Sequence, residues 1–145
     1  MARVSTYLNF SGNTEEAFGF YKNIFKTTFT PPGIMRLGEA PAQEGQPTLS
    51  EEVKNMVMHV ELPITGGHML MGTDAPEQMG FTITTGNNIH INLEPDDKEE
   101  TKRLFDALSE AGKVTMPLED MFWGAYFGSC IDKYGINWMF NCQTK

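Results

Sequence analysis

The feature that most constrains the fold of this chain is a repeated order of predicted elements. Residues 4–74 and 88–142 each predict a strand, a helix and three further strands, without evident sequence identity between the halves. An amphipathic helix and a half-buried sheet cover each other's apolar sides, so each half would lay its helix on one face of its own sheet. The two uncovered sheet faces would then build a common surface. The prediction is an α+β fold of two βαβββ modules within a single domain, residues 1–145.

Both predicted helices carry start signals and an apolar stripe. In the first half, Asn13 followed by Glu16 predicts an N-cap with a capping box and a helix from about 14 to 25. In the second half, Asp97 and Glu100 supply the same signal, and Gly112 stands where a C-cap glycine belongs. The stripes at helical spacing are Ala17, Phe20, Tyr21 and Ile24 in the first helix, and Leu104, Phe105, Leu108 and Ala111 in the second.

Alternation along the predicted strands separates a core face from a second face. In the last strand, the apolar residues Ile136, Trp138 and Phe140 alternate with two amides and a methionine. The same alternation predicts core positions for Val4, Leu8 and Phe10, and for Ile89, Ile91 and Leu93. The second face carries Tyr7, Asn9, His59, Glu61, His90, Asn92, Asn137, Met139 and Asn141.

Two segments interrupt the regular elements of the first half. The run Pro31-Pro32-Gly33 divides a strand signal, which indicates an edge strand or a bulge because proline cannot donate to a central ladder. Residues 38–55 combine Gly and Pro with acidic residues and almost no apolar ones, so they predict a long loop. A loop of this length is expected to be either mobile or a lid over a binding site.

Charge and cysteine content limit the classes of partner and the compartment. The chain has 11 Lys and Arg against 19 Asp and Glu, a net charge of -8, and no basic run, which disfavours a nucleic-acid partner. No stretch reads as a signal peptide or a membrane span, so the protein is expected to be cytoplasmic, with no membrane partner. Cys130 and Cys142 are interpreted as buried thiols, with a bridge across the last hairpin as the alternative.

Three groups of residues follow a known order and spacing. They are Tyr7-Leu8-Asn9-Phe10 with Ala17 and Phe20-Tyr21, the run Trp123-Gly124-x-x-Phe127-Gly128, and Asp132-x-x-Gly135-x-x-Trp138. Together they span nearly the whole chain and resemble the vicinal-oxygen-chelate superfamily of glyoxalase I, bleomycin resistance proteins and extradiol dioxygenases, in particular its PhnB-like branch. The resemblance implies two curled mixed sheets around an open groove, helices packed on the outer faces, and a homodimer.

The resemblance also implies where a metal would bind. Metal-dependent members hold a divalent ion with His or Glu at four inward-facing strand positions, which fall here on Ser5 or Thr6, Met71, His90 and Met139. Only His90 is a competent ligand, because a thioether is a soft donor that oxygen-preferring metals do not select. No cofactor is therefore expected.

A different divalent-metal site can still be drawn from the residues. His59, Glu61 and His90 share the second face and form a two-His, one-carboxylate set of the kind that binds ferrous iron. In the alternative interpretation, His59 and Glu61 pair with each other, His90 hydrogen-bonds to neighbouring amides, and no metal is involved.

These observations predict a metal-free protein whose groove binds a flat or partly apolar small molecule. One rival is an enzyme of the same fold, either a metal-dependent lyase or dioxygenase or a metal-free acid–base catalyst with Tyr7 as the acid and His59 or His90 as the base. Another is a dimeric interaction module with a vestigial groove. Trp123 and Phe127 have core packing or dimer contact as their alternative roles. The predicted groove residues are Tyr7, Asn9, His59, Glu61, Met71, His90, Asn92, Trp123, Phe127, Asn137 and Met139.

Overall fold

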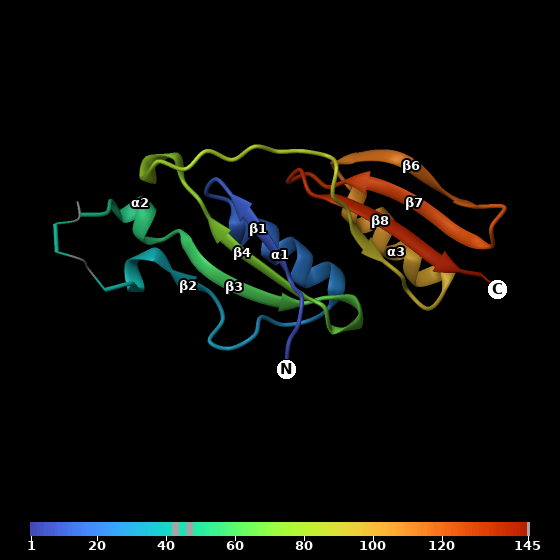
Figure 1. Cartoon of the computed structure of the whole chain (residues 1–145), viewed down its shortest axis with the longest axis horizontal. Helices are drawn as coiled ribbons and strands as arrows, with labels where there is room; N and C mark the ends of the chain where they lie inside the picture. The colour runs from blue at the N-terminus through green and yellow to red at the C-terminus, as the bar shows by residue number, and fades with distance from the viewer. Residues whose placement is uncertain (42–43, 46–47, 145) are drawn as a thin grey trace. The chain divides into compact units, whose positions relative to one another are not determined.

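Two four-stranded mixed sheets carry the fold, one in each half of the chain (Figure 1). The computed structural model describes residues 1–41, 44–45 and 48–144. The chain divides into two compact units, Met1–Thr84 and Thr85–Lys145, each with one sheet and one long helix. The predicted α+β class with two βαβββ modules is therefore confirmed, and each module lies within one unit.

The first unit contains strand β1 (Thr6–Phe10), helix α1 (Thr14–Phe25), β2 (Met35–Arg36), β3 (Val57–Pro63) and β4 (Met69–Asp74). Its strand order is β1-β4-β3-β2, with β1 parallel to β4 and the other pairs antiparallel. Short helical turns occupy the connections, namely η1 (Leu37–Glu39), α2 (Glu51–Lys54), η2 (Thr65–Gly67) and η3 (Glu77–Met79). One face of this sheet is covered by α1 (Figure 1).

The apolar side of α1 forms the core of the first unit. Ala17, Phe18 and Tyr21 are fully buried against the sheet, while Phe20 lies half-buried at the margin of the stripe. Gly72 of β4 leaves room for the Phe18 ring, because a Cβ atom at Gly72 would overlap that ring. Close contact between helix and sheet at this point therefore requires glycine.

The start of α1 is held by a carboxylate from the end of β4. Asn13 occupies the predicted N-cap position, but its side chain makes no capping hydrogen bond. Asp74 Oδ1 instead accepts hydrogen bonds from the Gly12 and Thr14 amides, both at 3.1 Å, and from Thr14 Oγ1 at 2.6 Å. Its Oδ2 accepts from the Val57 amide at 2.8 Å. The buried Asp74 therefore joins the helix start to β3 and β4.

The second unit repeats the topology with β5 (Ile91–Leu93), α3 (Lys98–Ser109), β6 (Lys113–Asp120), β7 (Ala125–Ile131) and β8 (Asn137–Gln143). Its strand order is β5-β8-β7-β6, with β5 parallel to β8 and the other pairs antiparallel. Its buried core includes Leu93, Leu104, Leu108, Trp138 and Phe140. Among the described residues, no helix is long and apolar enough to cross a lipid bilayer.

The predictions for α3 are right at its start and wrong at its end. The Asp97 side chain accepts a hydrogen bond from the Glu100 amide at 2.8 Å, which confirms the predicted N-cap. The helix ends at Ser109, and Ala111 lies beyond it, exposed and left-handed with a φ of 58°, instead of continuing the stripe. Gly112 is not the left-handed residue. Its small size matters because a Cβ there would overlap the Ile131 carbonyl oxygen.

Some predicted strands are shorter in the structure. Ile89 precedes β5 and is 78% exposed, and Val4 precedes β1 and is 85% exposed, so the predicted core positions of both are wrong. The two-residue β2 lies at the sheet edge with an irregular register, as the interruption at Pro31-Pro32-Gly33 predicts. Strand alternation alone does not reveal how many residues at a strand end are covered by other elements.

The segment 38–55 contains more structure than a plain loop. Ser50 caps α2 by accepting a hydrogen bond from the Val53 amide at 3.3 Å, and Val53 is buried. Residues 42–43 and 46–47 of the predicted loop lie outside the described residues. The interpretation of this segment as a lid stays a prediction.

Both cysteines are buried and free, which confirms their interpretation as thiols. The register of the last hairpin places Cys130 opposite Trp138 and Cys142 opposite Tyr126, so the two cysteines are not cross-strand partners. Burial raises the pKa of the Cys130 thiol to about 12, and the Asp132 carboxylate contributes to the rise. The thiolate form is therefore scarce at neutral pH, and Cys130 is unsuited to nucleophilic chemistry.

Candidate functional site

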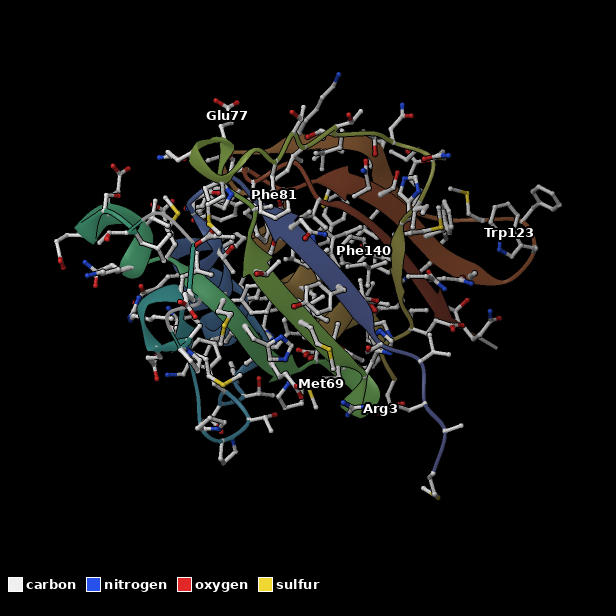
Figure 2. All side chains as sticks on the ribbon, turned by 60° about the vertical axis from the view of Figure 1, so that its left-hand side comes forward. Arg3, Met69, Glu77, Phe81, Trp123 and Phe140 are labelled. Atoms are coloured by element: carbon white, nitrogen blue, oxygen red, sulfur yellow. The ribbon has the colours of Figure 1, made fainter. Side chains whose placement is uncertain are left out.

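The sheet face of the first unit that points away from α1 gathers candidate residues from three strands. Tyr7 of β1 pairs with Met71 of β4, and Met71 pairs with Glu61 of β3. Directly opposed residues on neighbouring strands share a face, and His59 shares it with Glu61 because the side-chain period is two. Figure 2 shows the side chains on this sheet, with Met69 on β4 and with Phe81 from the segment that follows the sheet. The structure thus brings together four predicted groove residues.

A chain of hydrogen bonds links three of these side chains. The Tyr7 hydroxyl lies 3.0 Å from His59 Nδ1, and His59 Nε2 lies 2.8 Å from Glu61 Oε2. A carboxylate oxygen accepts hydrogen bonds, so we assign the proton of neutral His59 to Nε2, and Nδ1 accepts from the Tyr7 hydroxyl. Glu61 therefore sets the tautomer and orientation of the imidazole, as a carboxylate does in other histidine-based sites.

Among the three hydrogen-bonded side chains, Tyr7 is the most exposed and so the most accessible to a ligand. It is 48% exposed, whereas the side chains of His59 and Glu61 are each 24% exposed. Burial raises the pKa of the Tyr7 phenol, a hydrogen bond with Thr73 opposes the rise, and the Glu61 carboxylate adds to it. The phenol therefore stays neutral at physiological pH. Arg3 approaches Glu61 at 3.8 Å, a long and exposed contact of little energetic weight.

Methionines surround the hydrogen-bonded chain. Met35 is the register partner of His59, Met71 lies between Tyr7 and Glu61, and Met69 is two residues earlier on β4. All three are partly exposed. The Thr30 hydroxyl donates to Met69 Sδ at 3.8 Å. Thioether side chains are flexible and polarisable, so this surface can adapt to an apolar ligand.

In the first unit, the residues at the positions that the resemblance assigns to metal ligands do not fit a metal. Ser5 is the position that shares the face of Met71, because its hydroxyl donates to Met71 Sδ at 3.7 Å, while Thr6 Oγ1 lies 2.8 Å from His68 Nε2. A hydroxyl and a thioether are weak ligands for the divalent metals of this fold. Across the part of the chain that the structure describes, no group of three or more His, Cys, Asp or Glu side chains could hold a metal ion.

His59 and Glu61 provide two of the three ligands in the alternative metal set, and their pairing is the contact expected without a metal. His90, the third, precedes β5 in the other unit. The complete set stays a prediction.

The second unit presents its predicted groove residues in two groups. Asn92 and Met139 are register partners on β5 and β8, with Met139 half-buried and Asn92 exposed. Asn137 is buried, and its Nδ2 donates to the Gly86 carbonyl at 2.9 Å, so this amide ties down the chain entering the unit. Trp123 and Phe127 form an edge-on pair at a ring separation of 5.9 Å near the β6–β7 turn.

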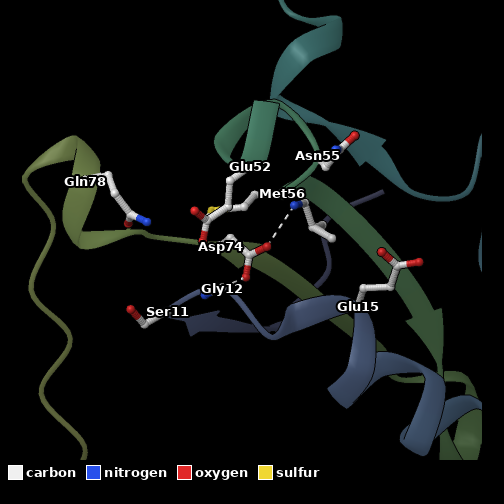
Figure 3. Close-up of a pocket in the computed structure, with 9 residues that line it drawn as sticks. Ser11, Gly12, Glu15, Glu52, Asn55, Met56, Asp74 and Gln78 are labelled. Carbon is white, nitrogen blue, oxygen red and sulfur yellow. Dashed lines mark hydrogen bonds between the residues drawn. The ribbon is translucent and has the colours of Figure 1, made fainter. Parts of the chain in front are cut away.

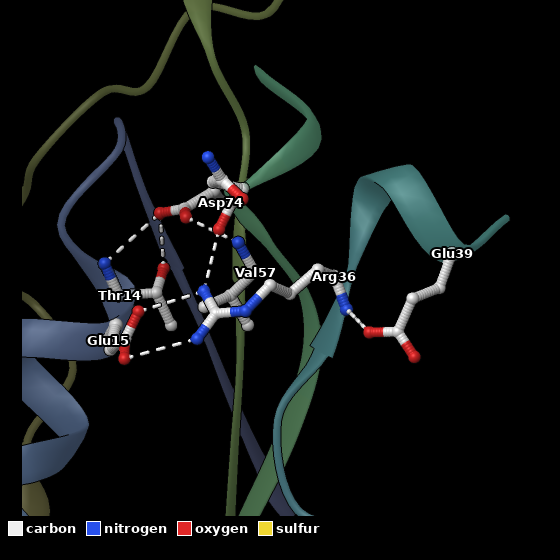
Figure 4. Close-up of polar contacts among 7 residues, drawn as sticks. Thr14, Glu15, Arg36, Glu39, Val57 and Asp74 are labelled. Atoms are coloured by element: carbon white, nitrogen blue, oxygen red, sulfur yellow. Dashed lines mark hydrogen bonds and ion pairs between the residues drawn. The ribbon is translucent and has the colours of Figure 1, made fainter. Parts of the chain in front are cut away.

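A cavity of about 320 Å³ lies beside the Asp74 carboxylate, lined by Ser11, Gly12, Glu15, Glu52, Asn55, Met56, Val57, Asp74 and Gln78 (Figure 3). Two of its three acidic residues, Glu15 and Asp74, have hydrogen-bond partners. Arg36 Nη1 and Nη2 donate to the two carboxylate oxygens of Glu15 at 2.9 and 3.2 Å, and Nη1 also donates to the Asn55 carbonyl at 2.7 Å (Figure 4). The Arg36 hydrogen bonds lower the pKa of Glu15. We interpret this region as a junction that fastens α1 to β2 and β3.

A second hollow, of about 400 Å³, lies beside β1. It is lined by Tyr7, Leu8, Asn9, Ala75, Phe81, Thr82, Ile83 and Thr84. The last four belong to a segment that sequence patterns place in a loop, and an aromatic residue between turn-forming residues is the only signal for their role. This hollow, here called the β1 cleft, has Tyr7 in common with the hydrogen-bonded chain.

Comparison with known proteins places this architecture in a class. Solved proteins of the glyoxalase, bleomycin resistance and dioxygenase group share the fold at low sequence identity. The chain has the fold of this vicinal-oxygen-chelate superfamily, as the sequence motifs predict. One FosX structure from Listeria monocytogenes, of the same fold, was solved with Mn(II). Metal binding therefore occurs in at least one protein of this fold.

Within that class, the chain belongs to the PhnB-like family whose model is described as 3-demethylubiquinone-9 3-methyltransferase and matches residues 2–140. The protein PA1353 from Pseudomonas aeruginosa is 32% identical, with a TM-score of 0.82 and 100% of both chains covered. A putative 3-demethylubiquinone-9 3-methyltransferase, PhnB protein, from Bacillus cereus is 26% identical, with a TM-score of 0.72 and coverage of 97% of this chain and 99% of that chain. Protein YjdN from Escherichia coli (strain K12) is 29% identical over 148 residues, 95% of this chain and 93% of the relative.

Proposed function

We propose that this protein binds a small, partly apolar organic molecule without a metal, and that the exposed sheet face of the first unit makes the central contacts. The supporting observation is the hydrogen-bonded chain of Tyr7, His59 and Glu61 among three methionines. Methionine side chains supply adaptable contact area, and the phenol and imidazole supply directional polar contacts. A flat ligand with an oxygen or nitrogen atom satisfies both.

The predicted groove residues of the second unit complete this proposal. Asn92 and Met139 offer the same pairing of an amide with a thioether, and His90 adds an imidazole. Trp123 and Phe127 are proposed as ligand contacts or, in the alternative, as contacts within a homodimer. The protein is proposed to act in the cytoplasm.

A ligand screen on metal-depleted protein tests the proposal. Neutral aromatic compounds carrying phenol, quinone or amide groups are screened by thermal shift, and hits are measured by isothermal titration calorimetry. Tyr7→Phe is expected to weaken a true ligand by about tenfold, because it removes one buried hydrogen bond on binding. Tyr126→Phe, which changes a half-buried tyrosine of the other unit, is the matched control. Equal effects of the two variants would argue against this face as the site.

A second candidate function, metal-free acid–base catalysis, has support at the same face. Glu61 orients His59, and His59 contacts a phenol that stays neutral, which is the arrangement of an acid with a proton-accepting partner. The family description names methyl transfer to a demethylated quinone, a reaction in which a hydroxyl group loses its proton. Turnover of screened ligands is therefore followed by mass spectrometry, with and without S-adenosylmethionine. His59→Gln, which keeps a polar side chain but removes the titratable ring, should abolish turnover and weaken binding much less.

The metal-dependent enzyme remains the competing proposal, with His59, Glu61 and His90 as ligands. Elemental analysis of untagged protein after incubation with Fe, Zn, Ni and Mn discriminates it. One bound metal per chain, lost in His90→Ala and kept in His68→Ala, would replace the metal-free proposal. Failure to bind either metals or small molecules would favour the interaction module.

A further inference from the structure

The β1 cleft differs from the other hollow in the first unit by having no charged residue in its lining. The apolar residues of its lining are Leu8, Ala75, Phe81 and Ile83, and the side chain of Leu8 belongs to the core. Its polar lining consists of one phenol, one amide and two hydroxyl groups, from Tyr7, Asn9, Thr82 and Thr84. A volume of about 400 Å³ falls within the usual range for small-molecule sites.

The lining residues outside β1 are Ala75 and 81–84, and a hydrogen-bonded turn lies between them. After β4, the Ala75 amide donates to the Phe10 carbonyl at 2.7 Å, which keeps the chain beside β1. The turn η3 follows, and Gly80 closes it in the left-handed conformation with a φ of 87°. The Phe81 amide donates back to the Pro76 carbonyl at 3.4 Å. These contacts place Phe81 beside the C-terminal end of β1, where it is 50% exposed (Figure 2).

Tyr7 connects this cleft to the hydrogen-bonded chain. Its hydroxyl hydrogen is directed to His59 Nδ1, so the phenol oxygen keeps lone-pair capacity as an acceptor. An aromatic ligand could contact the rings of Tyr7 and Phe81 and hydrogen-bond to the Asn9 amide. A charged ligand would lose hydration without meeting an opposite charge in the lining, which is costly.

We infer that the β1 cleft is a binding site for neutral, planar aromatic molecules of one to three rings. This inference rests on the proposed function, of which it names the ligand class. The selectivity for neutral ligands would come from residues 81–84, which lie outside the sheet and are not among the predicted groove residues. The cleft would favour neutral ligands over anionic ones of the same shape.

A matched pair of fluorescent probes tests the inference on the full chain. N-phenyl-1-naphthylamine is neutral, and 8-anilino-1-naphthalenesulfonate has the same ring core with a sulfonate. The neutral probe should bind at least about tenfold more tightly, since the anion meets no cation in the cleft and the chain has a net charge of -8. Equal or tighter binding of the sulfonate, or no binding of the neutral probe, would overturn the inference.

Two substitutions locate the probe. Phe81→Ala should weaken the neutral probe about fivefold through loss of aromatic contact, whereas Phe122→Ala, at a 95% exposed aromatic of the other unit, should have no effect. Thr82→Lys should selectively strengthen sulfonate binding by adding a cation. An unchanged affinity in Phe81→Ala would place the probe elsewhere and reject the cleft.

Met71→Ala separates this inference from the proposed function. Met71 lies on the sheet face but does not line the cleft. If Met71→Ala weakens binding while Phe81→Ala does not, the sheet face binds ligands and the cleft assignment fails. If neither variant changes the affinity for the neutral probe, both the cleft and the sheet face are rejected as its site.

Discussion

In the first unit, the start of helix α1 is capped by a residue far away in the sequence. In the second unit, the start of helix α3 is capped by its own N-cap residue. Asp74 accepts from the Thr14 amide across 60 residues of sequence, while Asp97 accepts from Glu100 three residues away. The second unit also has a buried carboxylate, Asp132, but this one organises the final hairpin. The two modules therefore share strand order and helix placement without sharing the contacts that stabilise them.

The exposed parts of the units differ in the same way. The first unit exposes a hydrogen-bonded chain among methionines on its sheet. The second exposes an aromatic turn, in which the Trp123 ring meets the rings of both Phe122 and Phe127 edge-on. Trp123 projects outward in Figure 2. The repeated topology therefore constrains where the side chains of the two units point, while the chemistry of those side chains differs between the units.

The largest expected effect comes from Asp74→Ala. The substitution leaves the Gly12, Thr14 and Val57 amides without their acceptor, at a cost of about 3–5 kcal/mol in the free energy of unfolding. Asp97→Ala removes a single exposed cap and should cost about 1 kcal/mol. Urea unfolding followed by circular dichroism measures both. Similar losses for the two variants would remove the distinction between distant and local capping.

Asp132→Ala should destabilise the second unit by about 2–4 kcal/mol. The Asp132 carboxylate accepts from the Tyr134 and Ile136 amides at 2.8 and 3.1 Å and from Trp138 Nε1 at 2.9 Å, so three donors lose their partner. Hydrogen exchange followed by mass spectrometry should show faster exchange within 85–144 than in the wild type. Asp74→Ala should show the complementary pattern within 1–84. Uniform changes over the whole chain would show that the units do not carry separate networks.

These carboxylates also mark how far the sequence predicts the structure. The Asp97 cap is predictable because its donor is three residues away, and helix α1 is predicted within its observed bounds of Thr14–Phe25. The Asp74 cap cannot be predicted from the sequence, because no local pattern connects residues 14 and 74. Likewise, alternation predicts that Tyr7, His59 and Glu61 share a face, but their hydrogen bonds follow from strand register. Residues 81–84 enter a cleft only through tertiary contacts that a loop prediction lacks.

The buried thiol provides a third contrast, since both cysteines belong to the second unit. The pKa of Cys130 is raised from 9.0 to about 12. The contribution of its neutral thiol to the free energy of unfolding is therefore fully present below pH 9 and is lost as the pH rises toward 12. Cys130→Ala should therefore flatten alkaline unfolding over this range. At pH 8, iodoacetamide should label Cys130 only after urea unfolding. Rapid labelling of the native protein would contradict the burial of this thiol.

The smallest expected effect belongs to the exposed aromatic turn. Phe122 is 95% exposed, so Phe122→Ser removes little buried apolar area and should change the free energy of unfolding by less than about 0.5 kcal/mol. Phe18→Ser, at a fully buried aromatic of the first unit, is the contrasting change and should cost at least about 3 kcal/mol. If the turn instead forms part of the proposed homodimer interface, Phe122→Ser will lower the dimer fraction in analytical ultracentrifugation. A concentration-dependent loss of stability in that variant would then give the exposed aromatics of the second unit a role in association.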